Sequence, residues 1–187
     1  MTSNADISIR RAHGPADRAA ISELAHRIWP AHYAPIIGHA QVDYMLAQGY
    51  TPTALAAAED AGTAFYLAEQ AGQALGYAAL APEPGPGPGP GPGPGPEPAT
   101  MLLDKLYLDA SARGQGIGRG LLAYLIDAAR AGRARQLTLR VNRHNTASIA
   151  FYQRAGFVIV AEHAKAIGHG YVMDDYLMTM DLSARSR

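Results

Sequence analysis

The chain has 187 residues, of which 48% are hydrophobic, and this length suits one α/β domain with a substantial core. Sixteen basic and sixteen acidic residues give a formal net charge of zero, so no global basic field favours nucleic acid as a partner. The absence of cysteine excludes disulfides, thiolate-bound metal and a cysteine nucleophile.

The chain also lacks the hydrophobic segments of a membrane protein. No apolar run approaches the ~20 residues that a membrane helix needs. Residues 1–11 lack the basic and apolar blocks of a signal peptide. We therefore expect a soluble cytoplasmic protein with no metal, no nucleic acid and no membrane among its partners.

The first part of the chain predicts a strand followed by two helices. Residues 7–9 alternate between apolar and polar side chains, as in a strand. Apolar residues at helical spacing predict a helix from Ala16, which we expect to end at Trp29 because the following proline disfavours helix there. A second helix is expected over residues 40–48, with Gly49 as its stop.

A hairpin and an unusual proline-rich segment come next. Two β-rich runs, residues 63–69 and 74–80, predict the hairpin. Gly-Pro dipeptides fill residues 85–96, within a Pro/Gly-rich insertion at 82–98. Glycine at every second position excludes a collagen helix, and the prolines remove half of the amide hydrogens that a strand ladder needs. We expect a solvated, extended loop inside a single domain of residues 1–187.

The remaining chain predicts strands that alternate with helices. A strand, a glycine-rich turn, a long helix, a strand, a short helix and two closing strands follow in that order. The strands cover residues 102–108, 136–141, 157–161 and 171–180, and the short helix covers 146–155. The long helix gathers on one face the apolar residues Leu121, Leu122, Leu125, Ile126 and Ala129.

The glycine-rich turn is Arg113-Gly114-Gln115-Gly116-Ile117-Gly118. The dinucleotide-binding motif G-x-G-x-x-G needs its third glycine at the position of Arg119 or of Leu121. A Walker phosphate-binding loop also needs a glycine at the position of Arg119. Both motifs are therefore excluded. Between a strand and a helix, glycines let the backbone close around a ligand, and the helix start offers unpaired amides. The motif therefore predicts a phosphate site, and a turn that needs glycine only for packing is the alternative.

A second motif follows about twenty residues later. It consists of Asn145, the small residue Ser148, Tyr152, and then Gly156-Phe157. Together the two motifs resemble the acyl-coenzyme A site of the GNAT N-acetyltransferase superfamily. The resemblance covers residues 7–182 apart from the Gly-Pro run. It implies an α/β fold in which a central mixed, splayed β-sheet is flanked by helices.

The resemblance also assigns an acetyl-CoA site. The strands at residues 102–108 and 136–141 would diverge around the pantetheine arm, Asn145 would hydrogen-bond to that arm, and Tyr152 would lie beside the thioester sulfur. Asn145 is alternatively only a helix N-cap, and Tyr152 only a core aromatic residue. The implied acetyl-CoA-binding residues are Leu106, Tyr107, Leu108, Arg113, Gly114, Gln115, Gly116, Ile117, Gly118, Arg119, Asn145 and Tyr152.

The implied reaction is direct attack of an amine on the acetyl carbonyl, without a covalent acyl-enzyme. Tyr152 suits protonation of the departing thiolate, because tyrosine has a reference pKa near 10 and a thiol one near 8.5. The general base would be Asp104, where some family members carry an acidic base. Asp104 is equally well explained as a solvated or paired carboxylate, and water relayed to Asp174, Asp175 or His163 is a further hypothesis.

Two further segments, residues 29–33 and 168–176, resemble a small-molecule branch of the superfamily that is related to bacterial polyamine acetyltransferases. The implied acceptor site contains Trp29, His32, Tyr33 and Asp174, with Tyr44, Tyr171 and Asp175 nearby. Sheet-forming tyrosines and a solvated turn are the structural alternative. We therefore expect an acetyl-CoA-dependent N-acetyltransferase for a primary amine of a small molecule.

Two other functions stay open on the sequence. One is acetylation of a protein or peptide, and the other is a catalytically silent acyl-CoA sensor. The resemblance also implies a homodimer, formed through the last strands. The identity of the acceptor does not follow from these residues.

Overall fold

The structure, a computed structural model, describes residues 7–83 and 100–183. Its strands are β1 (Ile7–Arg11), β2 (Ala64–Gln70), β3 (Gln73–Pro82), β4 (Thr100–Leu108), β5 (Gln136–Asn142), β6 (Val158–Gly168) and β7 (Tyr171–Asp181). Its helices are α1 (Gly14–Ile37), α2 (His39–Gly49), α3 (Pro52–Asp60), α4 (Ile117–Ala131) and α5 (Thr146–Arg154), with a 3-10 turn η1 (Ala110–Ala112). The Gly-Pro run lies outside the described residues, so the loop expected there stays a prediction.

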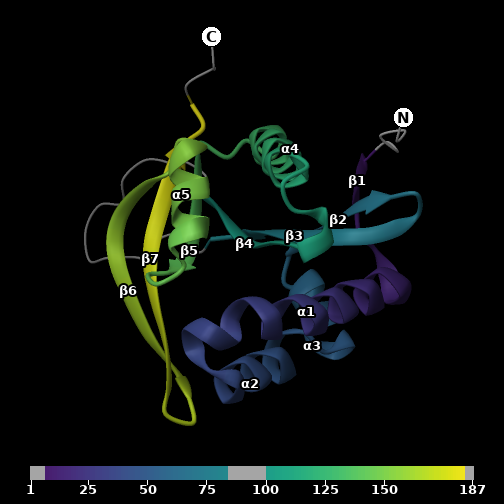
Figure 1. Cartoon of the computed structure of the whole chain (residues 1–187). Coiled ribbons are helices and arrows are strands. Elements are labelled where there is room, and N and C mark those ends of the chain that lie inside the picture. Colours follow the sequence, from purple (N-terminus) through teal and green to yellow (C-terminus); the bar gives the residue numbers. More distant parts are fainter. Residues whose placement is uncertain (1–6, 84–99, 184–187) are drawn as a thin grey trace. The chain divides into compact units, whose positions relative to one another are not determined.

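The described strands form one mixed sheet in the order β1-β2-β3-β4-β5-β7-β6 (Figure 1). Strands β4 and β5 are parallel, whereas the pairs β1–β2, β2–β3, β5–β7 and β6–β7 are antiparallel. The β2–β3 hairpin turns through Ala71 and Gly72, both at positive φ (50° and 78°), as a two-residue turn of type I′ requires. The predicted hairpin and the predicted mixed sheet are confirmed.

The described residues divide into two compact units. The first holds residues 7–80 and 105–125, and the second holds 81–83, 100–104 and 126–183. The boundaries fall inside β3, β4 and α4, so each of these elements contributes to both units. The glycine-rich turn therefore belongs to the first unit and the helix with Tyr152 to the second.

Helix α1 is longer than the sequence predicts. It continues through Pro30 to Ile37, and Gly38 then ends it with a φ of 83°. A proline inside a helix removes a backbone hydrogen bond and crowds the preceding turn, at a cost of about 3 kcal/mol. Trp29 is buried just before the proline and Tyr33 packs against the same core just after it, so tertiary packing outweighs this cost. The expected stop at Trp29 is therefore wrong.

Helix α3 is absent from the predicted elements, although its start carries a recognisable pattern. The hydroxyl of Thr51 caps the helix by accepting a hydrogen bond from the amide of Ala54 at 3.1 Å. Pro52 occupies the first helical position, where a missing amide hydrogen costs nothing. Leu55 is completely buried, so this short helix is part of the core.

Helices α1, α2 and α3 lie together in the first unit (Figure 1) and bury their apolar faces with strands β2 and β3. Their shared core combines aliphatic residues with several aromatic ones. It contains Ala12, Ile21, Leu24, Ala25, Ile28, Trp29, Val42, Leu46, Tyr50, Leu55, Phe65, Leu67, Tyr77 and Ala79.

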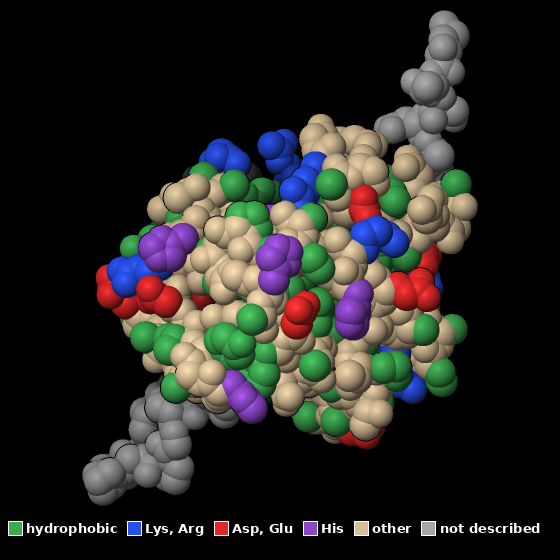
Figure 2. Space-filling view, turned by 60° about the horizontal axis from the view of Figure 1, so that its bottom comes forward, with side chains coloured by type: hydrophobic (Ala, Val, Ile, Leu, Met, Phe, Trp, Pro, Cys, Tyr) green, Lys and Arg blue, Asp and Glu red, His purple; other side chains and the backbone are tan. Residues whose placement is uncertain are grey.

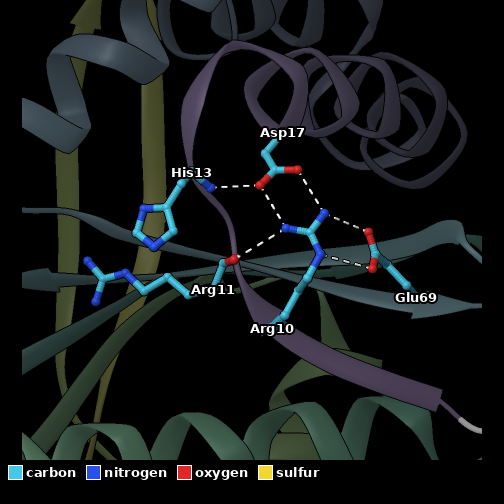
Figure 3. A network of polar contacts seen from close by, with 5 residues as sticks. All are labelled: Arg10, Arg11, His13, Asp17 and Glu69. Atoms are coloured by element: carbon cyan, nitrogen blue, oxygen red, sulfur yellow. Dashed lines mark hydrogen bonds and ion pairs between the residues drawn. The ribbon is translucent and has the colours of Figure 1, made fainter.

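Arg10 joins three elements of the first unit (Figure 3). Its guanidinium donates to both carboxylate oxygens of Asp17 at 2.7 and 2.8 Å and to both of Glu69 at 3.0 and 2.8 Å. Asp17 also accepts a hydrogen bond from the amide of His13 at 2.7 Å, next to the start of α1. Mainly through the bonds from Arg10, the pKa of Asp17 falls to about 2. The network therefore ties β1 to α1 and to β2.

Strand β5 carries the core of the second unit. Leu137, Leu139 and Val141 point to one face and are buried, whereas Arg140 points to the other and is exposed. Strand β6, which pairs with β7, is longer than predicted, and it exposes the apolar side chains Val158, Ile159 and Val160. The predicted homodimer stays a prediction.

None of the described helices is long and apolar enough to cross a membrane. On the face in Figure 2, Lys and Arg side chains occur together with Asp and Glu side chains, in keeping with the zero net charge.

Candidate functional site

The glycine-rich turn leads directly into helix α4. Gly114 and Gly116 adopt φ values of 76° and 80°, the left-handed region that glycine tolerates and other residues rarely adopt. A Cβ atom at either position would meet no atom within 4 Å. The conformation of the turn, rather than a lack of space, is therefore what requires glycine there.

The start of α4 is open to an anion. Gly116 precedes the helix and has no side chain that caps it, and its carbonyl accepts from the amide of Gly120 at 3.0 Å. The first amides of any helix lack partners within the helix, and the helix dipole is positive there. Arg113 and Arg119 are exposed on either side of this point. These groups can bind a phosphate, as the motif predicts.

Asp109 holds the turn in place. Its carboxylate accepts hydrogen bonds from the amide and the hydroxyl of Ser111 at 3.0 and 2.7 Å, and from Nε of Arg27 at 2.6 Å. These hydrogen bonds, mainly the two from Ser111, lower the pKa of Asp109 to about 2. Asp109 is not among the site residues predicted from the sequence. Asp-x-Ser is nevertheless a common pattern in which the aspartate side chain accepts a hydrogen bond from the backbone amide two residues later.

Strand β4 leads into this turn. Leu106, Tyr107 and Leu108 are partly buried in the first unit. A Cβ atom at Gly76 would lie 2.3 Å from Cδ2 of Leu108 and 2.7 Å from the backbone oxygen of Tyr107, so only glycine lets β3 approach β4 here. Asp104, the predicted base, lies earlier on β4, in the second unit, and is exposed.

Trp29 lies in an aromatic cluster of the first unit. Its indole Nε1 donates to the hydroxyl of Tyr77 at 3.0 Å, and its ring lies 4.7 Å from that of Tyr33 and 5.5 Å from that of Tyr107. Only 5% of Trp29 is exposed. Trp29 is therefore a core residue, and its role toward an acceptor stays a prediction.

His32 is next to this cluster, with its ring 4.7 Å from that of Tyr33. Burial lowers the pKa of His32, and the charge of Arg113 lowers it further. The charge of Arg113 in the glycine-rich turn therefore acts on His32 of α1. Burial also raises the pKa of Tyr107 well above its ordinary value.

In the second unit, Asn145 caps helix α5. Its Oδ1 accepts a hydrogen bond from the amide of Ser148 at 3.3 Å, and its backbone oxygen accepts one from the amide of Ile149 at 3.0 Å. The side chain is buried. The capping interpretation of Asn145 is confirmed, and its contact with a ligand stays a prediction.

Tyr152 lies near the end of the same helix and is 9% exposed. Its ring is 5.2 Å from that of Phe151 and 5.6 Å from that of Phe157. Gly156, at φ 103°, ends the helix, as predicted. The ring of Tyr152 is thus held by aromatic packing.

Two consecutive aspartates of strand β7, Asp174 and Asp175, differ in their exposure to solvent. Asp174 has a side chain that is 40% exposed and accepts a hydrogen bond from Arg143 at 3.4 Å. Asp175 is only 4% exposed. Burial raises the pKa of Asp175 to about 6, although His163 and Arg140 oppose this shift. From the sequence, Asp175 is expected both among the relays for the base and near the acceptor site, and it is not distinguished there from Asp174, because adjacent aspartates on a strand look alike in sequence.

The predicted site residues therefore form two groups, each inside one unit. Those of the first unit are Trp29, His32, Tyr33, Leu106, Tyr107, Leu108, Arg113, Gly114, Gln115, Gly116, Ile117, Gly118 and Arg119. Those of the second unit are Asp104, Asn145, Tyr152 and Asp174.

A strand, a glycine turn at positive φ and a helix start with exposed arginines form the candidate anion site, next to a mixed β-sheet. The model of the acetyltransferase (GNAT) family matches residues 20–157. The chain belongs to this family.

Two curated relatives are similar over parts of their lengths. A phosphinothricin N-acetyltransferase of Alcaligenes faecalis is 35% identical over 128 residues, which are 67% of this chain and 60% of that protein. The peptidyl-lysine N-acetyltransferase YjaB of Salmonella typhimurium is 37% identical over 57 residues, 30% of this chain and 36% of that protein. The chain thus spans less than two thirds of the length of either relative.

Solved structures share the fold over nearly the whole chain. The PaiA N-acetyltransferase of Thermoplasma acidophilum, in complex with coenzyme A, has a TM-score of 0.73 and 19% identity, with 94% of this chain and 99% of that one covered. YncA of Salmonella typhimurium, with acetyl-CoA, has a TM-score of 0.62 and 26% identity, with 98% of each chain covered. The predicted GNAT fold is confirmed.

Proposed function

We propose that this protein transfers the acetyl group of acetyl-CoA to a primary amine of a small molecule. The observation that carries the proposal is the left-handed turn at Gly114 and Gly116, immediately before α4, in a chain of the GNAT family. Exposed backbone amides and two arginines at a helix start are the donors that the diphosphate of coenzyme A requires.

Acetyl-CoA supplies the activated acetyl group, and the protein residues hold it. Arg113, Arg119 and the amides of residues 114–119 would bind the diphosphate. Backbone groups of residues 106–108 would pair with the pantetheine arm, as an added strand does. Asn145, at the start of α5, would bind the same arm.

Tyr152 would serve as the acid. The amine nitrogen forms a bond with the acetyl carbon, the carbon–sulfur bond breaks, and the sulfur takes the proton of the Tyr152 hydroxyl. The proton lost by the amine goes to a carboxylate or to water, and Asp104 on β4 is one candidate for that base. The buried position of Tyr152 between two aromatic rings supports this role, because a fixed donor needs no reorganisation during the reaction.

The acceptor is proposed to be small. The relative that matches the larger share of this chain is named a phosphinothricin N-acetyltransferase, and phosphinothricin is a small amine. A second candidate function is acetylation of a lysine side chain in a protein, which the name of the shorter match favours.

The test is release of free coenzyme A, measured by a thiol reagent, when the purified protein is mixed with acetyl-CoA and one acceptor at a time. The panel contains small primary amines, phosphinothricin and lysine-containing peptides, and a sample without acceptor measures hydrolysis. We expect at least one small amine to exceed every peptide in kcat/KM. Faster acetylation of a peptide would establish the second candidate, and no transfer to any acceptor would refute both.

A further inference from the structure

Helix α1 is joined to the segment that leads into the glycine-rich turn. Nε of Arg27 donates to Asp109 at 2.6 Å, and the ring of Tyr33 lies 6.1 Å from that of Tyr107. Residues 107–109 directly precede η1 and the turn, and all of these residues belong to the first unit. The part of α1 between Arg27 and Tyr33, which includes His32, is therefore fixed beside this segment.

His32 feels the charge of the residue that begins the turn. Its side chain is partly buried, and its ring lies 4.7 Å from that of Tyr33. Burial lowers the pKa of His32, and the positive charge of Arg113 lowers it further. A charge acts in this way only over a short, poorly screened distance. The imidazole and the guanidinium of Arg113 therefore belong to one local environment.

The other charged or titratable groups on α1 and on the elements packed against it in the first unit are paired, exposed or part of the aromatic cluster. The ion pairs are Asp17–Arg10, Arg18–Glu59 and Arg27–Asp109. Exposed groups include Glu23, His26, His39, Asp43 and Asp60, and Tyr44 is partly buried. The cluster contains Tyr33, Tyr50, Tyr77 and Tyr107, with Nζ of Lys105 over the ring of Tyr50 at 5.4 Å. Within this unit, the charge that acts on His32 is that of Arg113.

A diphosphate beside Arg113 would reverse the electrostatic effect on His32. The diphosphate of coenzyme A carries two negative charges, whereas the guanidinium carries one positive charge. Because Coulomb energy is proportional to charge, a bound diphosphate at a similar distance outweighs Arg113 and favours the protonated imidazole. An imidazolium ion has N–H donors on both ring nitrogens, and its hydrogen bonds to phosphate oxygens are among the strong ones in proteins.

We propose that His32 binds the diphosphate of coenzyme A together with Arg113, and that it does so as the imidazolium ion. The proposal rests on the proposed function, which assigns the diphosphate to the glycine-rich turn. It adds a basic residue of α1 to a site that the glycine motif alone does not complete. It also moves His32 from the acceptor half of the reaction, where the family resemblance places it, to the donor half.

Binding of the cofactor should then take up a proton. In the free protein the pKa of His32 lies below its ordinary value of 6.5, and in the complex it should lie above the value in the free protein. Between these two pKa values the imidazole is neutral before binding and charged afterwards. The affinity for the diphosphate should therefore be highest below this window and should fall as the pH rises through it.

Nuclear magnetic resonance tests the contact directly. The Cε1–H resonance of His32 is followed against pH, after assignment by its loss in His32→Gln. Saturating 3′-dephospho-CoA, which keeps the diphosphate but has no phosphate monoester that titrates near pH 6, should raise the titration midpoint. Pantetheine at the same concentration, which has the arm but no phosphate, should leave it unchanged. A midpoint that dephospho-CoA does not raise, or that pantetheine raises equally, overturns the proposal.

Calorimetry measures the same contact as an affinity. The Kd of the wild type for dephospho-CoA should be about tenfold lower at pH 5.5 than at pH 8.5. Buffers of different ionisation enthalpy should reveal proton uptake inside the window. His32→Gln should lose the uptake and most of the pH dependence. The control His26→Gln, on the exposed side of the same helix, should keep both. The same pH dependence in His32→Gln as in the wild type refutes the role of His32.

Kinetics distinguish a donor role from an acceptor role. At pH 6, His32→Gln should raise the KM for acetyl-CoA by about tenfold, and by less at pH 8, while the KM for the amine stays within about twofold. A rise confined to the KM for the amine would return His32 to the acceptor site and contradict the proposal.

The binding measurements also separate this inference from the proposed function. A midpoint of His32 that dephospho-CoA raises, in a protein that transfers acetyl to no amine, supports the diphosphate contact and refutes the proposed function. Acetyl transfer by a protein whose His32 midpoint does not move supports the proposed function and refutes the contact.

Discussion

The carboxylate of Asp109 accepts a hydrogen bond from Nε of Arg27 at 2.6 Å and so connects helix α1 to the residue before η1. The amide of Asp109 also donates to the backbone oxygen of Leu75 at 2.8 Å, which adds a contact with β3. Two elements far apart in the sequence thus position the turn that leads to Gly114.

Asp109→Asn should destabilise the protein by about 1–2 kcal/mol at pH 7, as measured by urea unfolding. The fall of the Asp109 pKa from 3.8 to about 2 corresponds to about 2.4 kcal/mol, and we reduce this because Arg27 is 53% exposed. A lowered folded-state pKa stabilises above the unfolded value. The difference between variant and wild type should therefore shrink as the pH falls from 4 toward 2.

Asp127→Asn is the control, since Asp127 is 78% exposed and pairs with Arg130 only at 3.5 Å. It should change the free energy of unfolding by less than about 0.5 kcal/mol. Equal effects of the two variants would show that Asp109 is no anchor.

Gly116→Ala and Gly120→Ala should have opposite effects on stability. Gly116 has a φ of 80°, which alanine adopts only at a cost of about 1 kcal/mol. Gly120 lies inside α4 with no atom within 4 Å of an added Cβ, so alanine there should stabilise by about 0.5–1 kcal/mol. Thermal unfolding measures both changes.

The same pair of variants tests the phosphate site. Calorimetry should show weaker coenzyme A binding for Gly116→Ala than for Gly120→Ala, because only the first changes the direction of the amides at the helix start. Equal affinities would remove the turn from the binding site.

The elements near this turn were predictable because their patterns are local. The apolar residues of β4, the glycines at residues 114–118 and the apolar face of α4 each depend on neighbouring residues alone. The end of α1 was not predictable in this way. The rule that a helix stops before Pro30 is local, and the packing of Trp29 and Tyr33 against strands far along the chain overrides it.

Tyr152→Phe should lower kcat at least tenfold, because the variant cannot protonate the departing sulfur. Binding of coenzyme A should stay within about twofold, since the aromatic contacts with Phe151 and Phe157 need only the ring. The control is Tyr124→Phe, on the exposed side of α4, which should leave kcat unchanged. Full activity of Tyr152→Phe would exclude Tyr152 as the acid.

In the candidate site, too, some features follow from neighbouring residues in the sequence, whereas others depend on tertiary contacts. The cap at Asn145 and the end of α5 at Gly156 follow from the short motif itself. The pairing of β7 with β5 and β6 decides whether Asp174 or Asp175 is buried. The sequence of β7 alone does not reveal this pairing. The hydrogen bond from Trp29 to Tyr77 likewise joins residues 48 positions apart.

Asp175→Asn should stabilise the protein at alkaline pH. The folded state raises the pKa of Asp175 from 3.8 to about 6, so it holds a proton that the unfolded chain has lost between these values. Stability therefore falls as the pH rises through this window, by up to about 3 kcal/mol in total. Asn has no such penalty. Urea unfolding at pH 8 should show the variant more stable than the wild type, and the difference should disappear below pH 4. A variant that is less stable at pH 8 would show that the Asp175 charge stabilises the fold.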